Sequence, residues 1–239
     1  MRTREEQEAI NKACKYHPDT KEELQELVDE PKVYLGDIDT SEITNMQYLF
    51  FCSEREDFSG IEKWDISKVT RMHGMFEGCK NFNQPLNDWD VSNVKDTSQM
   101  FDGCENFNQP LNDWNVSKVE DMYGMFAYCT SFNQPLNDWD VSNAKVLCDL
   151  FDHCEQFNQD LNDWVIREDC KVKGMFDGCN KQTYDNVKMI GFSKTQLQDL
   201  DPSEEENRFV KGFKEQMGLS RKEPAQEAKE QSHYVKFLH

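Results

Sequence analysis

The chain has 239 residues, of which 37% are hydrophobic and 31% are charged, and its formal net charge is −19. Its 16 Phe, 10 Met and 5 Trp exclude a disordered chain, because such chains contain few large apolar side chains. Residues 180–239 carry ten basic and ten acidic residues, so the negative excess belongs to residues 1–179. Such a surface argues against direct contact with nucleic acid or an anionic membrane. It favours either simple solubility or a protein partner with a basic surface.

The N-terminus begins MRTREEQEAINK, without the apolar segment of a signal peptide, and the chain has no run of 18 apolar residues. Nine cysteines without an export signal favour reduced thiols. We therefore expect a cytoplasmic protein.

Residues 4–16 and 20–30 are predicted to be helices, and Thr20 with Glu23 forms a capping-box pattern. Residues 1–32 are assigned to an N-terminal helical cap.

A 25-residue repeat of about six units fills residues 33–180, which we predict to be one repeat domain. The block FNQPLNDWDVSNV recurs almost unchanged at 82–94, 107–119 and 132–144. Three residue types keep the same step: Trp64, Trp89, Trp114, Trp139 and Trp164; Phe76, Phe101, Phe126, Phe151 and Phe176; Cys79, Cys104, Cys129, Cys154 and Cys179.

Each repeat has two parts with different apolar spacing. The first part alternates like a strand with one buried face, at Leu86, Trp89, Val91 and Val94. The second has the i, i+3, i+4, i+7 spacing of a helix, at Met72, Met75, Phe76 and Cys79. A serine precedes each predicted helix as its N-cap, at Ser67, Ser92, Ser117 and Ser142, and Ser117 with Glu120 matches a capping box. Because 25 residues cannot bury enough surface alone, the units must stack.

The elements LxxWDVSxV and MxxMFxGCxxFNQPL resemble the BspA-like leucine-rich repeat family, in its 25-residue subfamily with the WDVS strand. This resemblance implies an α/β fold: a right-handed, leucine-rich-repeat-like solenoid. It would have a parallel sheet on the concave face, short helices on the other face, and helical caps at both ends. Known members are bacterial surface proteins in adhesion and host contact, which is one function that the resemblance implies.

Residues 181–239 are predicted to be a C-terminal helical cap or tail. Ser203 precedes a segment with acidic residues in its first turn, which suits a helix that ends at Gly218. A last helix is expected at about 224–237. We expect residues 180–217 to pack against the last repeat.

The strand prediction also defines a candidate binding surface. If Trp89 and Val91 point inward, the polar side chains between them must point outward onto the concave sheet face. The candidate set is Asp65, Asp88, Asp90, Asp113, Asn115, Asp138, Asp140 and Asp163. On strands about 4.8 Å apart, aligned carboxylates would repel one another by roughly 1 kcal/mol in water. The carboxylates could accept local hydrogen bonds and be copies of a duplicated repeat. They could instead bind a basic protein or, less easily without a calcium loop, a cation.

Other chemistry finds little support in the sequence. One Cys per 25 residues is not zinc-ligand spacing, so we predict buried thiols and no metal. Asn83, Asn108, Asn133 and Asn158, with the Gln after each, are expected to bond backbone groups in turns. The five histidines lack a Ser, Cys or carboxylate at a catalytic spacing. We therefore predict no enzymatic activity and no cofactor.

The leading hypothesis is a non-enzymatic protein–protein interaction scaffold that uses its acidic concave face. A second hypothesis is an acidic inhibitor that imitates nucleic acid and occupies a DNA- or RNA-binding protein, as a phage or mobile-element counter-defence factor would. A third is a bacterial surface or host-interaction protein, as the resemblance implies.

Overall fold

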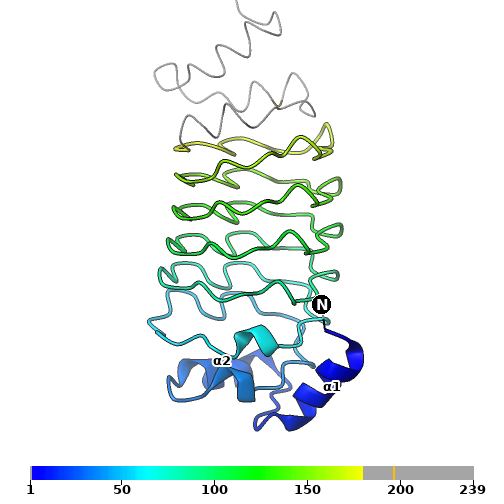
Figure 1. Cartoon of the computed structure of the whole chain (residues 1–239), viewed down its shortest axis with the longest axis vertical. Helices are drawn as coiled ribbons and strands as arrows, with labels where there is room; N and C mark the ends of the chain where they lie inside the picture. Colours follow the sequence, from blue (N-terminus) through cyan, green and yellow to red (C-terminus); the bar gives the residue numbers. More distant parts are fainter. Residues whose placement is uncertain (1, 180–195, 197–239) are drawn as a thin grey trace, which may run out of the picture. The chain divides into compact units, whose positions relative to one another are not determined.

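The computed structural model describes residues 2–179 and Gln196, which all belong to a compact unit spanning Met1–Pro202; Ser203–His239 form a second unit. The predicted C-terminal helices therefore lie outside the described residues. The helical elements are α1 (Arg4–Ala13), α2 (Lys21–Asp29), and two 3₁₀ helices, η1 (Leu35–Asp37) and η2 (Ile61–Lys63). The rest of the described chain runs in turns and extended segments. These form stacked coils, with α1 and α2 at one end of the described stack (Figure 1).

Both N-terminal helices form within the predicted ranges 4–16 and 20–30, although α1 ends at Ala13, three residues early. The Thr20–Glu23 capping box is confirmed, and Thr3 with Glu6 forms a second box at the start of α1. The two helices differ in how they attach. In α2 the side chains of Leu24 and Val28 are buried, whereas α1 has no buried residue. The contacts of α1 are therefore those of a surface helix.

The predicted parallel sheet is wrong. Among the described residues no strand forms, and the β-type pairing between successive coils is limited to isolated parallel bridges. The bridge that joins the stacked coils involves one residue per coil: Asn45, Arg71, Asp96, Asp121, Val146 and Lys171. These residues follow the predicted strand instead of lying within it. The leucine-rich-repeat sheet and its concave face are therefore not the architecture of this chain.

The segment predicted as a strand is interrupted by two turns. The amide of Trp89 bonds the carbonyl of Leu86 at 3.0 Å, and that of Val94 bonds Val91 at 2.9 Å. Side chains make the contacts to the neighbouring coil instead. The indole Nε1 of each repeat Trp donates to a carbonyl of the preceding coil at 2.8–3.1 Å, for Trp64, Trp89, Trp114, Trp139 and Trp164.

The helices predicted inside the repeats are also absent from residues 33–179. Overlapping turns take their place, with amide-to-carbonyl bonds from Met75 to Met72, from Glu77 to Gly74 and from Cys79 to Phe76. Gly74 and Gly78 have φ of 57° and 76°, and such left-handed residues end a right-handed helix. The predicted serine N-caps and the Ser117–Glu120 capping box are therefore wrong as well.

Backbone amides in residues 72–79 donate alternately to acceptors in their own coil and in the next coil. The amides of Met75, Glu77 and Cys79 close the turns within the coil, as given above. The even-numbered amides donate to the next coil over 2.7–2.9 Å: Met72 to Asp96, Gly74 to Ser98, Phe76 to Met100, and Gly78 to Asp102. The coil therefore depends on its neighbour for four of these seven hydrogen bonds.

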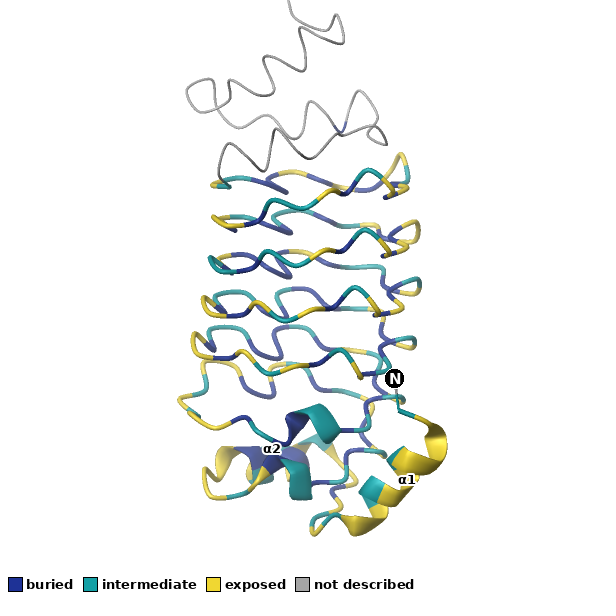
Figure 2. Cartoon of the chain, viewed as in Figure 1, coloured by how far each residue is buried: buried dark blue, intermediate teal, exposed yellow. Residues whose placement is uncertain are grey.

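Aromatic side chains fill the interior in two parallel columns. Phe50, Phe76, Phe101, Phe126, Phe151 and Phe176 stack with ring centroids 5.5–5.7 Å apart. Phe82, Phe107, Phe132 and Phe157 form the second column at 5.8–6.1 Å. Buried positions recur at the same places in successive coils (Figure 2). The sequence thus predicts the inward face correctly although its backbone conformation differs.

Cysteine and asparagine columns also join the coils. The predicted burial of the repeat thiols is confirmed for Cys79, Cys104, Cys129 and Cys154, while Cys179 is half-buried. Each of these five thiols donates to a Phe carbonyl of the preceding coil at 2.9–3.0 Å. The side-chain oxygen of Asn83 accepts the amide of Asn108 at 3.0 Å, and Asn133 and Asn158 continue this pattern. The expected role of these Asn residues in the turns is therefore confirmed.

We predict that Trp114→Phe lowers the free energy of unfolding by about 1–3 kcal/mol, because it leaves the buried carbonyl of Leu86 without its indole donor. Differential scanning calorimetry would measure this as a lower melting temperature. Tyr128→Phe is the control, since Tyr128 is 46% exposed and should change stability little. Equal melting temperatures for Trp114→Phe and wild type would contradict the assigned role of the indole.

We predict that Cys52 is the first thiol to react with a thiol reagent at pH 8, because it is exposed. Burial raises the pKa of Cys104, Cys129 and Cys154 well above 9.0, so their reactive thiolate forms are scarce until the protein unfolds. Time-resolved labelling of Cys52→Ser should lack the fast phase, whereas Cys148→Ser should retain it. A fast phase that survives in Cys52→Ser would contradict this assignment.

Candidate functional site

The eight predicted surface residues fall into two structurally different sets. In the first set the side chain accepts the backbone amide of the serine two residues later at 3.1–3.2 Å, as seen for Asp65, Asp90, Asn115 and Asp140. The hydroxyls of Ser67 and Ser117 add bonds of 2.7 Å to Asp65 and Asn115. Hydrogen bonds from Ser142 lower the pKa of Asp140. This set has a local structural role, because it shapes a turn in each coil.

We call the second set the acidic column; it consists of Asp88, Asp113, Asp138 and Asp163. All four are exposed, as predicted from the sequence. Asparagines of the preceding coil orient two of them: Asn87 Nδ2 donates to Asp113 at 2.8 Å, and Asn112 Nδ2 donates to Asp138. The amide of Asp138 also donates to the side-chain oxygen of Asn112 at 3.1 Å. The column therefore presents one carboxylate per coil, and two of these are held in place.

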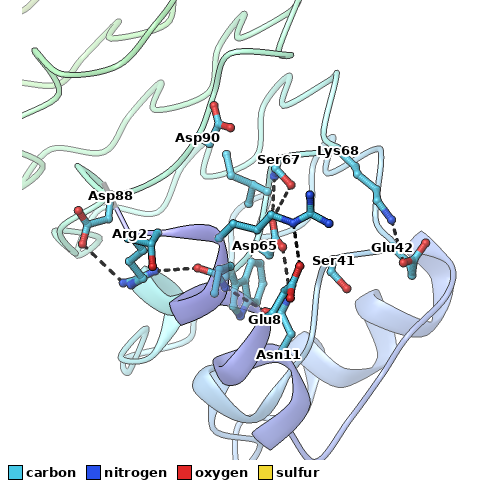
Figure 3. A pocket seen from close by; sticks show the side chains of 15 residues that line it. Arg2, Glu8, Asn11, Ser41, Glu42, Asp65, Ser67, Lys68, Asp88 and Asp90 are labelled. Atoms are coloured by element: carbon cyan, nitrogen blue, oxygen red, sulfur yellow. Dashed lines mark hydrogen bonds and ion pairs between the residues drawn. The ribbon is translucent and has the colours of Figure 1, made fainter.

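The N-terminal end of the acidic column lies beside a cleft of about 610 Å³, which α1 and the first coils enclose (Figure 3). Asp65, Asp88 and Asp90 line the cleft, together with Glu8 and Glu42. These five carboxylates face three cationic side chains, those of Arg2, Arg4 and Lys68. The cleft is therefore polar, with an excess of negative charge.

Two side chains of the N-terminal segment contact the acidic surface in this cleft. A guanidinium nitrogen of Arg2 lies 3.7 Å from the Asp88 carboxylate and also donates to the carbonyl of Glu62 at 2.7 Å. Asn11 donates to Asp65 at 3.0 Å (Figure 3). The acidic column thus already accepts one guanidinium group from its own chain. A carboxylate beside a backbone carbonyl is a suitable acceptor pair for arginine.

The structure also assembles a hydrogen-bonded group that the sequence analysis missed. Tyr48, His73 and Ser98 are spaced by 25 residues, and the stacking of coils brings them together. The Tyr48 hydroxyl bonds His73 Nε2, His73 Nδ1 bonds the Ser98 hydroxyl, and that hydroxyl donates to Asp96. The repeat period itself was the signal that could have found this group.

The direction of these bonds decides what the group can do. The Ser98 proton is directed to Asp96, so the Ser98 oxygen accepts from Nδ1–H of His73. The Tyr48 hydroxyl bonds Nε2 on the other side of the ring. Because His73 donates to Ser98 instead of accepting its proton, it is not positioned as a base for this serine. Ser98 is also buried, with 5% of its surface exposed. The group ties three coils together.

No group of three or more His, Cys, Asp or Glu side chains suited to hold a metal ion occurs in the part of the chain that the structure describes. Over the same residues, no helix is long and apolar enough to cross a membrane.

Comparison with known families gives one match. The family described as "Mycoplasma protein of unknown function, DUF285" matches residues 22–123 and 86–189, which together span the repeats. The chain therefore belongs to the DUF285 family. This membership agrees with the predicted resemblance to BspA-like repeat proteins and establishes a repeat protein. No curated protein matches the chain, and no solved structure does.

We predict that α1 is held to the stack mainly by its polar contacts, because it has no buried residue. Replacing both Arg2 and Asn11 by Ala should speed amide hydrogen exchange in α1 by about tenfold, the equivalent of about 1.4 kcal/mol. The exchange of α2 should stay unchanged. The matched control is Gln25→Ala, which removes the 3.0 Å bond from α2 to the carbonyl of Leu49 and should affect α2 instead. Unchanged exchange in the α1 variant would refute this attachment.

Proposed function

We propose that the protein is a non-enzymatic protein-interaction module whose acidic column binds a basic surface of a partner protein. The observation that carries this proposal is the contact of Arg2 with Asp88 at 3.7 Å. This contact is an example, within the chain, of a cationic side chain bound by the acidic column. Asp113, Asp138 and Asp163 offer comparable exposed carboxylates on the following coils.

The geometry of the acidic column favours a protein partner over a metal ion. A metal ion needs several oxygens that converge on one centre, whereas the column offers one carboxylate per coil. Asp113 and Asp138 already accept amide hydrogens of Asn87 and Asn112, and both residues remain exposed to further donors. Arginine and lysine side chains from a protein surface can each contact a different coil. The column would then fix the register of the partner along the stack.

Two finer assignments accompany this proposal. The motifs WDVS and MFxGCxxFNQPL support membership of the 25-residue BspA-like subfamily within the established family. Nine cysteines without a disulfide among them suit a reducing compartment, and we propose the cytoplasm on that ground.

The test changes Asp88, Asp113, Asp138 and Asp163 together to Asn and measures binding of an arginine-rich peptide by fluorescence anisotropy. We expect at least a tenfold rise in Kd at 0.15 M salt, because four charge-assisted contacts are weakened. The matched control removes four exposed carboxylates elsewhere, by changing Glu26, Glu54, Glu56 and Glu105 to Gln. Equal loss in both variants would mean that net charge alone attracts the peptide, and would overturn the proposal.

Affinity capture from the native lysate with the same two variants extends the test to natural partners. Proteins that the wild type and the control retain, but the column variant loses, are partners of the acidic column. If those partners bind nucleic acid, and if nucleic acid competes with the chain for them, the inhibitory mimic becomes the better description. Partners that remain with the column variant would exclude the column as their binding site.

A further inference from the structure

Most positive charges of the repeat stack fall in one part of each coil. Residues 33–179 contain eleven Lys and Arg residues, and eight of them fall in residues 67–73 or in the equivalent seven residues of later repeats. We call these eight the basic strip: Lys68, Arg71, Lys95, Lys118, Lys145, Arg167, Lys171 and Lys173. Seven are exposed and Arg167 is half-buried. Every coil from Lys68 onward contributes at least one of them.

The basic strip has a defined centre. Lys95, Lys118, Lys145 and Arg167, from four successive coils, line a shallow depression of about 350 Å³ together with Glu120 and Asn143. The pKa of Glu120 is lowered, first by its hydrogen bond with Lys145 and further by the charges of Lys95 and Arg167. One carboxylate therefore already lies among four cations. The strip holds four other carboxylates, at Asp96, Asp121, Glu168 and Asp169, and keeps a positive excess.

The acidic column and the basic strip lie side by side. Asp88 and Asp90 line the same cleft as Lys68, and in Figure 3 Asp65 and Ser67 lie between Asp88 and Lys68. Because the repeat is copied coil by coil, Asp138 bears the same sequence relation to Lys118 as Asp88 does to Lys68. One face of the stack thus carries a line of carboxylates next to a line of cations.

We propose that this face pairs with the same face of a second copy of the chain, so that the acidic column of each copy lies against the basic strip of the other. The proposal rests on the proposed function, because it names the basic surface that the acidic column binds. Two properties favour a second copy over another anion. Its carboxylates have the coil spacing of the cations, since both come from the same repeat. The face of the second copy also carries both an acidic column and a basic strip. One interface therefore pairs two acidic columns with two basic strips.

The layout of the charges selects one arrangement of the pair. A two-fold axis parallel to the stack places each acidic column opposite a basic strip and keeps the coils of the two copies in register. A two-fold axis that makes the stacks antiparallel and exchanges the two faces would set carboxylates against carboxylates. The parallel arrangement is isologous, so it closes at two copies. Nucleic acid fits this face less well, because the acidic column beside the strip would repel its phosphates.

The net charge of −19 on each copy opposes association. The distance over which this repulsion acts decides whether two copies can pair. At 0.15 M ionic strength the Debye length is about 8 Å, so charges on distant parts of two copies are largely screened from one another. Pairs in contact across the face are screened less. At 1 M salt the Debye length falls to about 3 Å and the contacting pairs weaken too. A dimer held by this face must therefore dissociate as salt rises.

Sedimentation velocity on the full chain provides the first test. We expect a concentration-dependent dimer at 0.15 M salt, with an association constant at least tenfold lower at 1 M. A monomer at every concentration and salt, or a dimer indifferent to salt, would overturn the proposal. Neither result would affect the peptide test of the acidic column, so failure of the self-pairing and failure of the proposed function can be told apart.

Charge exchange provides the specific test. One variant changes Lys95, Lys118 and Lys145 to Glu, and a second changes Asp113, Asp138 and Asp163 to Lys. Each should be a monomer alone, because each carries two lines of like charge. An equimolar mixture should form a one-to-one dimer, because the two faces are then fully complementary. Failure of the mixture to associate would overturn the proposal.

The matched control changes Lys12, Lys32 and Lys80 to Glu, three exposed cations outside the basic strip, and should dimerise like the wild type. Calorimetry of every variant checks that the fold is kept. If a charge-reversed variant unfolds, the neutral changes of the same residues to Gln or Asn replace it. Those changes should lower the association constant at least tenfold, and an unchanged constant would count against the proposal.

Discussion

The alternation of backbone amides is the constraint on which the rest of the structure depends. Half of the amides in residues 72–79 leave their own coil and bond the next one, so no coil can satisfy its backbone alone. Stacking is therefore required by hydrogen bonding as well as by apolar burial. The same requirement extends past the last repeat, where Gln196 donates to the carbonyls of Arg167 and Cys170 at 2.8 and 3.1 Å. These two carbonyls thus receive a donor from a side chain beyond the repeats.

Left-handed residues make this alternation possible. Two positions per coil, four residues apart, have positive φ, and in the second coil both are glycines, Gly74 and Gly78. Other coils place larger residues there, at Tyr48, Cys52, Gln99, Tyr128, Asp149 and His153. Each non-glycine residue in this conformation costs roughly 1–2 kcal/mol. The stacked Phe columns and the Trp, Cys and Asn bonds between coils offset that cost, which is why the same residue types recur at each turn of the stack.

The sequence predicts which side chains face inward far better than it predicts the backbone that carries them. The stripe Met72, Met75, Phe76 and Cys79 is buried as expected, yet overlapping turns give the same i, i+3, i+4, i+7 spacing as a helix. Two glycines four residues apart inside the stripe were the available sign of a non-helical segment. Likewise, Trp89 and Val91 alternate as in a strand, but turns on both sides leave room for no ladder. At the candidate site, exposure of the acidic column follows from the pattern. The division of the eight residues into turn acceptors and the acidic column depends on turns that the pattern does not encode.

A repeat protein converts the choice of one residue into a property of a whole surface, because a charge at one position is copied at every coil. Solubility requires net charge but no particular position for it. In this chain the cations of the stack instead collect in seven of 25 repeat positions, beside a line of carboxylates that the chain's own Arg2 already contacts. Separation of charge at this scale gives the face a direction and a register, which uniform solubilising charge would not. Register along the stack is what allows a linear array of individually weak ion pairs to select one partner and one alignment.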